Sequence, residues 1–161
     1  MKKYIRCHLV EAEPMTRGEH LKSKGLSLIP GSGSESDEGY RVVYPDGYQS
    51  WCPKAQFEEA GRPVDGMTFG MAIEAMKAGK KVARAGWNGK GMWLCVPLVD
   101  GPKEIPATGI WGKPNAKYAE DNGGTVKVMP YVTMKTADGS IVMGWLASQT
   151  DMLSDDWVIV G

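Results

Sequence analysis

The clearest structural signal in this chain is the stretch Pro130-Tyr-Val-Thr-Met-Lys-Thr-Ala-Asp-Gly-Ser-Ile-Val-Met-Gly-Trp145. Two runs with β-branched and apolar residues flank a centre that contains Asp138-Gly139, a dipeptide typical of tight turns between paired strands. The stretch therefore predicts an antiparallel hairpin with strands at 130–136 and 141–145.

The segments around this hairpin predict a mixture of short helices and strands. Thr16 and Glu19 have the spacing of a capping box, which predicts a helix that ends near residue 24. Thr68 precedes apolar residues at helical spacing, which predicts another helix. We expect strands at 3–10, 39–44, 48–51, 81–84, 92–96 and 157–160, a helix at 53–60, a helical turn at 148–153, and no clear periodicity at 98–129. The pattern favours an α+β fold of two small domains, each an antiparallel meander sheet with one or two short helices.

The best candidate for a domain boundary is Gly61-Arg-Pro-Val-Asp-Gly66, because glycine and proline interrupt both helices and strands. We therefore expect a first domain at 1–60, a linker at 61–66 and a second domain at 67–161. With 161 residues, of which 42% are hydrophobic, the chain is long enough for two small cores.

The charge of the chain disfavours duplex nucleic acid as a partner. Lys and Arg total 19, as do Asp and Glu, so the formal net charge is zero. Duplex DNA or RNA requires a broad basic surface, whereas a small phosphorylated ligand needs only one or two well-placed donors. The N-terminal residues lack the apolar core of a signal peptide, and no run is long enough to span a bilayer. We expect a cytoplasmic protein with no membrane partner.

The sequence predicts no metal site, no cofactor and no disulfide framework. Cys7, Cys52 and Cys95 are odd in number and far apart, and His8 and His20 are the only histidines. Because no Cys or His residues have the spacing of metal ligands, we expect free thiols in a reducing compartment.

The segment from Trp145 to Trp157 predicts a recognition site. Between its aromatic ends it holds a run of four side chains that form hydrogen bonds, Ser148, Gln149, Thr150 and Asp151. Flat apolar faces beside such groups suit nucleobases and ribose hydroxyls. The alternative is a helix cap at Ser148 with both tryptophans buried in a core, but one helix end uses only one or two capping side chains.

The stretch Gly86-Trp-Asn-Gly-Lys-Gly-Met-Trp93 is a second candidate for ligand contacts. Its glycines would let backbone amides approach a phosphate, Lys90 would supply charge, and a tryptophan would stack on a base. The alternative is a tight Asn88-Gly89 hairpin with Trp93 in the core, and the spacing matches neither a P-loop nor a dinucleotide fingerprint. Since Trp87 stands among glycines, we expect its truncation to remove stacking rather than to open a core cavity.

Catalysis has little support in the sequence. Asp151 and Asp155 are one helical turn apart and could form a hydrolytic pair, but a solvated face is the simpler interpretation. No nucleophile beside a base is evident. The alternatives to a binding protein are a hydrolase that uses these carboxylates, and a structural or assembly protein.

Three blocks of the chain, at 67–94, 130–139 and 145–157, closely resemble the second Thoeris anti-defence family. They include Met67-Thr-Phe-Gly-Met-Ala-Ile-Glu-Ala-Met, Ala85-Gly-Trp-Asn-Gly-Lys-Gly-Met-Trp-Leu94 and the Trp145–Trp157 segment, in the family's order. The family is small and mostly encoded by phages and prophages. Residues 1–60 contain Val10-Glu-Ala-Glu-Pro-Met-Thr16 and Tyr44-Pro-Asp-Gly-Tyr-Gln-Ser-Trp51 and resemble a separate small module found on phage proteins. This module is the main argument for the alternative of a phage structural or assembly protein.

The resemblance implies a sponge rather than an enzyme. Such proteins resemble cytosolic homotetramers that sequester glycocyclic ADP-ribose, an immune signal made by TIR-domain proteins, and some relatives also bind cyclic oligonucleotides. Their pockets lie between protomers and combine aromatic stacking with polar contacts. On matching positions, the resemblance implies that the pocket residues here are Phe69, Trp87, Asn88, Ser148, Gln149, Thr150 and Asp151.

Overall fold

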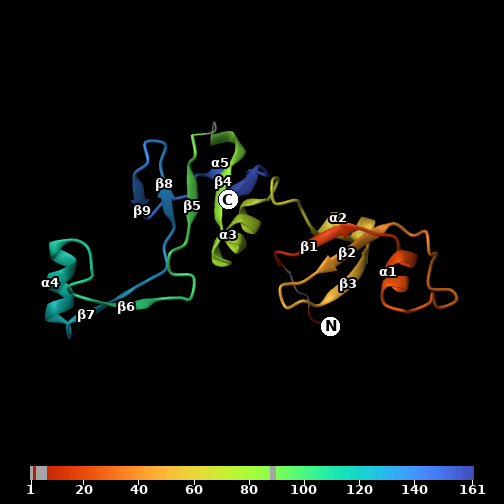
Figure 1. Cartoon of the computed structure of the whole chain (residues 1–161). Coiled ribbons are helices and arrows are strands. Elements are labelled where there is room, and N and C mark those ends of the chain that lie inside the picture. Colours follow the sequence, from red (N-terminus) through yellow and green to blue (C-terminus); the bar gives the residue numbers. More distant parts are fainter. Residues whose placement is uncertain (1, 3–6, 88–89) are drawn as a thin grey trace. The chain divides into compact units, whose positions relative to one another are not determined.

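The computed structural model describes residues 2, 7–87 and 90–161 of the chain. The chain divides into two compact units, Met1–Pro63 and Val64–Gly161, and the division lies within the segment 61–66. Both units combine antiparallel sheets with short helices (Figure 1), which confirms the predicted α+β class. Within the described residues, no helix is both long enough and apolar enough to cross a bilayer.

The N-terminal unit is built on a three-stranded antiparallel sheet of order β1-β2-β3. Thr16 caps the first helix and forms the predicted capping box with Glu19. The elements are β1 (Glu11–Pro14), α1 (Arg17–Ser23), β2 (Gly39–Val43), β3 (Gln49–Pro53) and α2 (Lys54–Ala60).

The predicted strand at 3–10 is wrong where the structure describes it. Residues 7–10 have no regular structure, and residues 3–6 lie outside the described residues. The strand that pairs with β2 begins at Glu11, opposite Val43, and ends at Pro14, opposite Tyr40. The pairing partner, which lies far along the chain, sets the register of such a short strand more strongly than the local alternation of polar and apolar residues does.

Aromatic side chains hold the N-terminal unit together. Tyr40 on β2 stacks on Phe57 of α2 with ring centroids 4.3 Å apart. The indole N–H of Trp51 donates to the carbonyl of Met15 over 2.9 Å. Gly39 lies against the same ring, and a Cβ there would stand 2.5 Å from it, so this position has no room for a side chain.

The C-terminal unit is built on a five-stranded antiparallel sheet of order β10-β4-β5-β8-β9. The predicted hairpin is present as β8 and β9, with Lys135 opposite Ile141. The last strand returns to pair with β4, so this sheet is not a simple meander. The strands of this sheet are β4 (Lys81–Arg84), β5 (Trp93–Cys95), β8 (Thr133–Lys135), β9 (Ile141–Met143) and β10 (Trp157–Val160).

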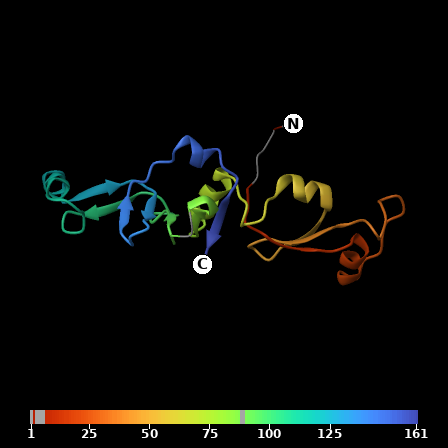
Figure 2. The ribbon, with the colours of Figure 1, turned by 90° about the horizontal axis from the view of Figure 1, so that it is seen from above.

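Helix α3 (Phe69–Lys77) packs on this sheet and completes the core. Thr68 caps it through a hydrogen bond from the Met71 amide, and its spacing places Ala72, Ala75 and Met76 on the buried face. These side chains contact Val82, Leu94 and Trp157 from the strands. Figure 2 shows α3 and β10 side by side, so residues at the two ends of this unit's sequence meet in one core.

The expectation of an irregular segment at 98–129 is wrong. The chain leaves the five-stranded sheet after β5, forms a hairpin and a helix, and returns at β8 (Figure 1). The hairpin strands β6 (Lys103–Pro106) and β7 (Thr125–Val128) are antiparallel, and α4 (Lys113–Asp121) lies between them in sequence. Pro114 in the first turn of the helix and the alternation of Val126, Lys127 and Val128 are local signals that could have predicted these elements.

Candidate ligand-recognition site

Four aromatic rings from separate parts of the C-terminal unit form one cluster around Trp157. The rings of Phe69, Trp87 and Trp145 lie 5.3, 5.5 and 6.3 Å from that of Trp157. Trp145 also lies 6.4 Å from Phe69 and 6.3 Å from Trp87, with its ring edge-on to both. The structure therefore places Phe69 and Trp87, two of the pocket residues that the resemblance implies, against the same ring of Trp157.

The rings of this cluster differ in exposure. Trp157 is completely buried, whereas Phe69, Trp87 and Trp145 are half-buried and pack against the core with part of their surfaces open. Trp87 lies in the 3₁₀ turn Ala85–Trp87, which follows β4 directly. The expectation that Trp87 stands free of the core is wrong, because its ring packs edge-to-face on Trp157.

Of the four polar residues at 148–151, two cap a helix and the other two have exposed side chains. Ser148 and Asp151 form a capping box on the four-residue helix α5 (Gln149–Met152). The Ser148 hydroxyl donates to Asp151 Oδ2 over 2.7 Å and accepts from the Asp151 amide over 3.1 Å. A Ser and an Asp three residues apart are the local signal for this box, as Thr16 and Glu19 are for the box at α1.

The side chains of Gln149 and Thr150 are left for solvent or ligand. Both residues are exposed, and neither side chain forms a hydrogen bond with another described residue. The turn that carries them is fixed to the aromatic cluster, because the indole N–H of Trp157 donates to the carbonyl of Asp151 over 2.9 Å. These two side chains therefore project from a helical turn anchored on the buried ring.

Arg84 at the end of β4 forms an ion-pair network that the sequence reasoning missed. Its Nε lies 2.8 Å from Asp156 Oδ1, and its Nη1 lies 3.1 Å from Asp151 Oδ1. The side chains of Arg84 and Asp151 are each 15% exposed, so water screens this pair less than a surface pair. Asp156 Oδ2 also accepts the amide of Gly86 over 3.0 Å.

These contacts set the ionisation of the carboxylates. Burial alone would raise the pKa of Asp151, but hydrogen bonds from Ser148 and the charge of Arg84 outweigh it and hold the pKa below its ordinary value. For Asp156, the hydrogen bond from Arg84 is the main reason for a lowered pKa, with the Gly86 amide contributing. Both carboxylates are therefore ionised at neutral pH, and each is bonded within the protein.

Two further sequence candidates are Lys90 and Asn88. Lys90 is exposed and forms no hydrogen bond or ion pair with another described residue. Asn88 lies outside the described residues. The groups that the structure brings together are thus three half-buried rings, Phe69, Trp87 and Trp145, and two exposed polar side chains, Gln149 and Thr150.

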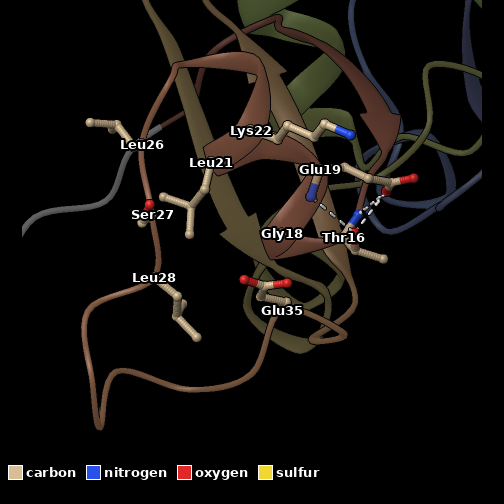
Figure 3. Close-up of a pocket in the computed structure, with 9 residues that line it drawn as sticks. All are labelled: Thr16, Gly18, Glu19, Leu21, Lys22, Leu26, Ser27, Leu28 and Glu35. Atoms are coloured by element: carbon tan, nitrogen blue, oxygen red, sulfur yellow. Dashed lines mark hydrogen bonds between the residues drawn. The ribbon is translucent and has the colours of Figure 1, made fainter.

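Two open cavities of about 430 and 340 Å³ lie in the N-terminal unit, not at the aromatic cluster. Figure 3 shows the larger one, where Leu21 and Leu28 face Glu35 beside the start of α1. None of the residues that the sequence predicts to bind ligand lines either cavity. Within residues 7–87 and 90–161, no three His, Cys, Asp or Glu side chains are grouped so that they could hold a metal ion.

Comparison with known proteins assigns the C-terminal unit to a family. Residues 67–160 match the model of the Thoeris anti-defense 2-like domain. A protein of Bacillus phage SP01, named Thoeris anti-defense 2, is 38% identical over 94 residues, which cover 58% of this chain and 94% of that protein. The match spans α3, the five-stranded sheet, the β6–β7 hairpin and the aromatic cluster. The chain therefore belongs to the Thoeris anti-defense 2-like family.

Proposed function

We propose that this protein is a phage anti-defence sponge. It binds and sequesters, without cleaving it, a cyclic ADP-ribose-type signal, glycocyclic ADP-ribose, which TIR-domain proteins make, and it thereby inhibits Thoeris immunity in the cytoplasm of the infected bacterium. Family membership supports the anti-defence role, because the similar phage protein carries that role in its name. The observation that carries the proposal is the cluster of half-buried rings beside free polar side chains on α5.

The chemistry of the cluster suits an adenine nucleotide. Adenine stacks on the open face of Trp87 or Phe69, while Gln149 and Thr150 bond ribose hydroxyls and Lys90 approaches the phosphates. A base stacked on an aromatic side chain contributes roughly 1–3 kcal/mol, and a hydrogen bond to a charged group contributes about 1.5–3 kcal/mol. A few such contacts in a preformed site reach nanomolar affinity, about −12 kcal/mol.

Ser148 and Asp151 contribute to this site mainly by capping α5, the helical turn that carries Gln149 and Thr150. Both Asp151 oxygens already accept hydrogen bonds within the protein, from Ser148 and from Arg84. The same contacts disfavour the hydrolase alternative, because a carboxylate with a lowered pKa that is held by an arginine is a poor general acid and a weak base.

The exposed surface of the C-terminal unit supports a homo-oligomer, which we propose is a tetramer with ligand sites between protomers. All three residues of the edge strand β9 are exposed, Ile141 by 52%, Val142 by 45% and Met143 by 44%. Leu146 and Leu153, at either side of α5, are 88% and 82% exposed. An apolar edge strand is a pairing surface, and a second copy of the same strand would cover it.

A thermal-shift screen followed by calorimetric titration tests the proposal. The probes are cyclic ADP-ribose, its glycocyclic isomer, and cyclic di- and trinucleotides. A ligand present at about a thousand times its Kd stabilises the folded protein by about 4 kcal/mol, which is a readily measured rise in melting temperature. We expect such a rise with the glycocyclic isomer.

Matched variants locate the site. Gln149→Ala and Phe69→Leu weaken binding, whereas Trp111→Ala is the control, because Trp111 lies outside the cluster, just before α4, and is 64% exposed. If no cyclic nucleotide raises the melting temperature, the sponge proposal fails and a structural or assembly role becomes the better account. If Trp111→Ala weakens binding as much as Gln149→Ala does, the ligand site does not lie at the aromatic cluster.

A further inference from the structure

One arginine connects the two segments that carry the proposed contact residues. Arg84 bonds Asp156, whose second oxygen accepts the amide of Gly86, the residue before Trp87. Figure 1 places β4, which ends at Arg84, next to α5. The turn that carries Trp87 is therefore tied to the guanidinium through a single carboxylate.

The same guanidinium also holds α5. Arg84 Nη1 donates to Asp151 Oδ1 over 3.1 Å, and the other oxygen of Asp151 closes the capping box with Ser148. That capping box starts the turn on which Gln149 and Thr150 stand. A planar fork of donors can bond two carboxylates at once, which a lysine ammonium on a flexible stem does far less well.

We infer that Arg84 is a positioning residue of the ligand site, which fixes the Trp87 turn and α5 in one arrangement before ligand binds. The inference rests on the proposed function, and Arg84 acts through Asp151 and Asp156 rather than by touching the ligand. When both segments are ordered before the ligand binds, none of the binding free energy is used to order them.

Gly86 belongs to the same hydrogen-bonded network, because its amide donates to Asp156. A Cβ at this position would stand 3.0 Å from Asp156 Oδ2, which is closer than nearly all real contacts of a Cβ. Gly86 does not have a positive φ, so alanine fits its backbone and acts only by displacing the carboxylate. Gly86→Ala is therefore a second variant that perturbs the network and leaves Arg84 in place.

The test compares affinity among variants of the full chain that are folded. Calorimetry with glycocyclic ADP-ribose is done at 10 °C, after circular dichroism shows that each variant is folded. We expect Arg84→Met to raise Kd by about ten- to a hundredfold, because two segments must then be ordered on binding. Arg84→Lys and Gly86→Ala should raise it less. Arg41→Met, which removes the ion pair with Glu13 in the N-terminal unit, is the matched control with unchanged Kd.

A readout without ligand separates this inference from the proposed function. We expect slow hydrogen exchange of the Gly86 amide in the parent protein, because this amide donates to Asp156, and faster exchange in Arg84→Met. If Arg84→Met is folded with a Kd within twofold of the parent and an equally protected Gly86 amide, the inference is overturned. If Arg84→Met does not fold, Gly86→Ala with an unchanged Kd overturns it instead. If the parent binds no cyclic nucleotide, the proposed function fails, and amide exchange alone decides whether Arg84 holds the turn.

Discussion

Replacing Trp157 by alanine removes the ring on which Phe69, Trp87 and Trp145 pack, together with one hydrogen bond. The side chain is completely buried, and truncation of such a large aromatic residue costs about 3–5 kcal/mol. Loss of its bond to the carbonyl of Asp151 adds about 1 kcal/mol. For a unit of this size, 1 kcal/mol corresponds to about 4–8 °C, so the melting temperature should fall by about 20 °C or more.

Calorimetric melting of the full chain measures this loss, with near-ultraviolet circular dichroism to follow the tryptophans. Trp51 reports on the N-terminal unit, whose transition should not move. Trp111→Ala is the control, and as a surface substitution it should change stability by no more than about 0.5 kcal/mol. If the melting temperature of Trp157→Ala lies within a few degrees of that of the parent, the aromatic cluster does not stabilise the fold, and the assignment of Trp157 to the core is wrong.

Three further predictions concern the domains, the assembly and the pH dependence. A chain that begins at Val64 should fold and bind ligand like the full protein, and loss of affinity in a folded truncation would contradict this. Light scattering at micromolar concentration should give the mass of a homo-oligomer, and Val142→Lys on the edge strand should lower it; a monomeric parent would refute the proposed assembly. Acid should destabilise the C-terminal unit. Because the pKa values of Asp151 and Asp156 are lowered in the folded state, their contribution is present above the ordinary value of 3.8 and is lost as pH falls below it. In urea titrations from pH 6 to pH 3, the free energy of unfolding of Arg84→Met should change less with pH than that of the parent. An equal change in both proteins would show that these ion pairs do not cause the pH dependence.

Signals that lie within a few residues were sufficient to predict much of the fold. The capping box at Thr16, the cap at Thr68 and the turn at Asp138-Gly139 each depend on side chains that meet locally, and each is present. In the turn, Thr136 and Ser140 bond the carboxylate of Asp138 and lower its pKa to about 2. The pairing of β10 with β4 depends instead on residues more than 70 positions apart, for which one sequence offers no local signal.

The candidate site was only partly predictable for the same reason. Its residue types were evident in the sequence, and the structure brings Phe69, Trp87 and the 148–151 run into one unit around Trp157. What the sequence could not provide was the partner of each group. Asp151 looked free to accept from a ligand because its arginine partner lies 67 residues away.

Sequestration itself is tested most directly by capture and release. Purified protein is saturated with glycocyclic ADP-ribose, passed through a desalting column to remove unbound ligand, and heat-denatured, and the released ligand is identified by mass spectrometry. The account predicts that intact ligand is recovered in stoichiometric amount, even after hours of incubation, and that the recovered ligand again activates the Thoeris effector. Recovery of a cleaved product would show that the protein is an enzyme, and recovery of no ligand would show that it does not bind the signal.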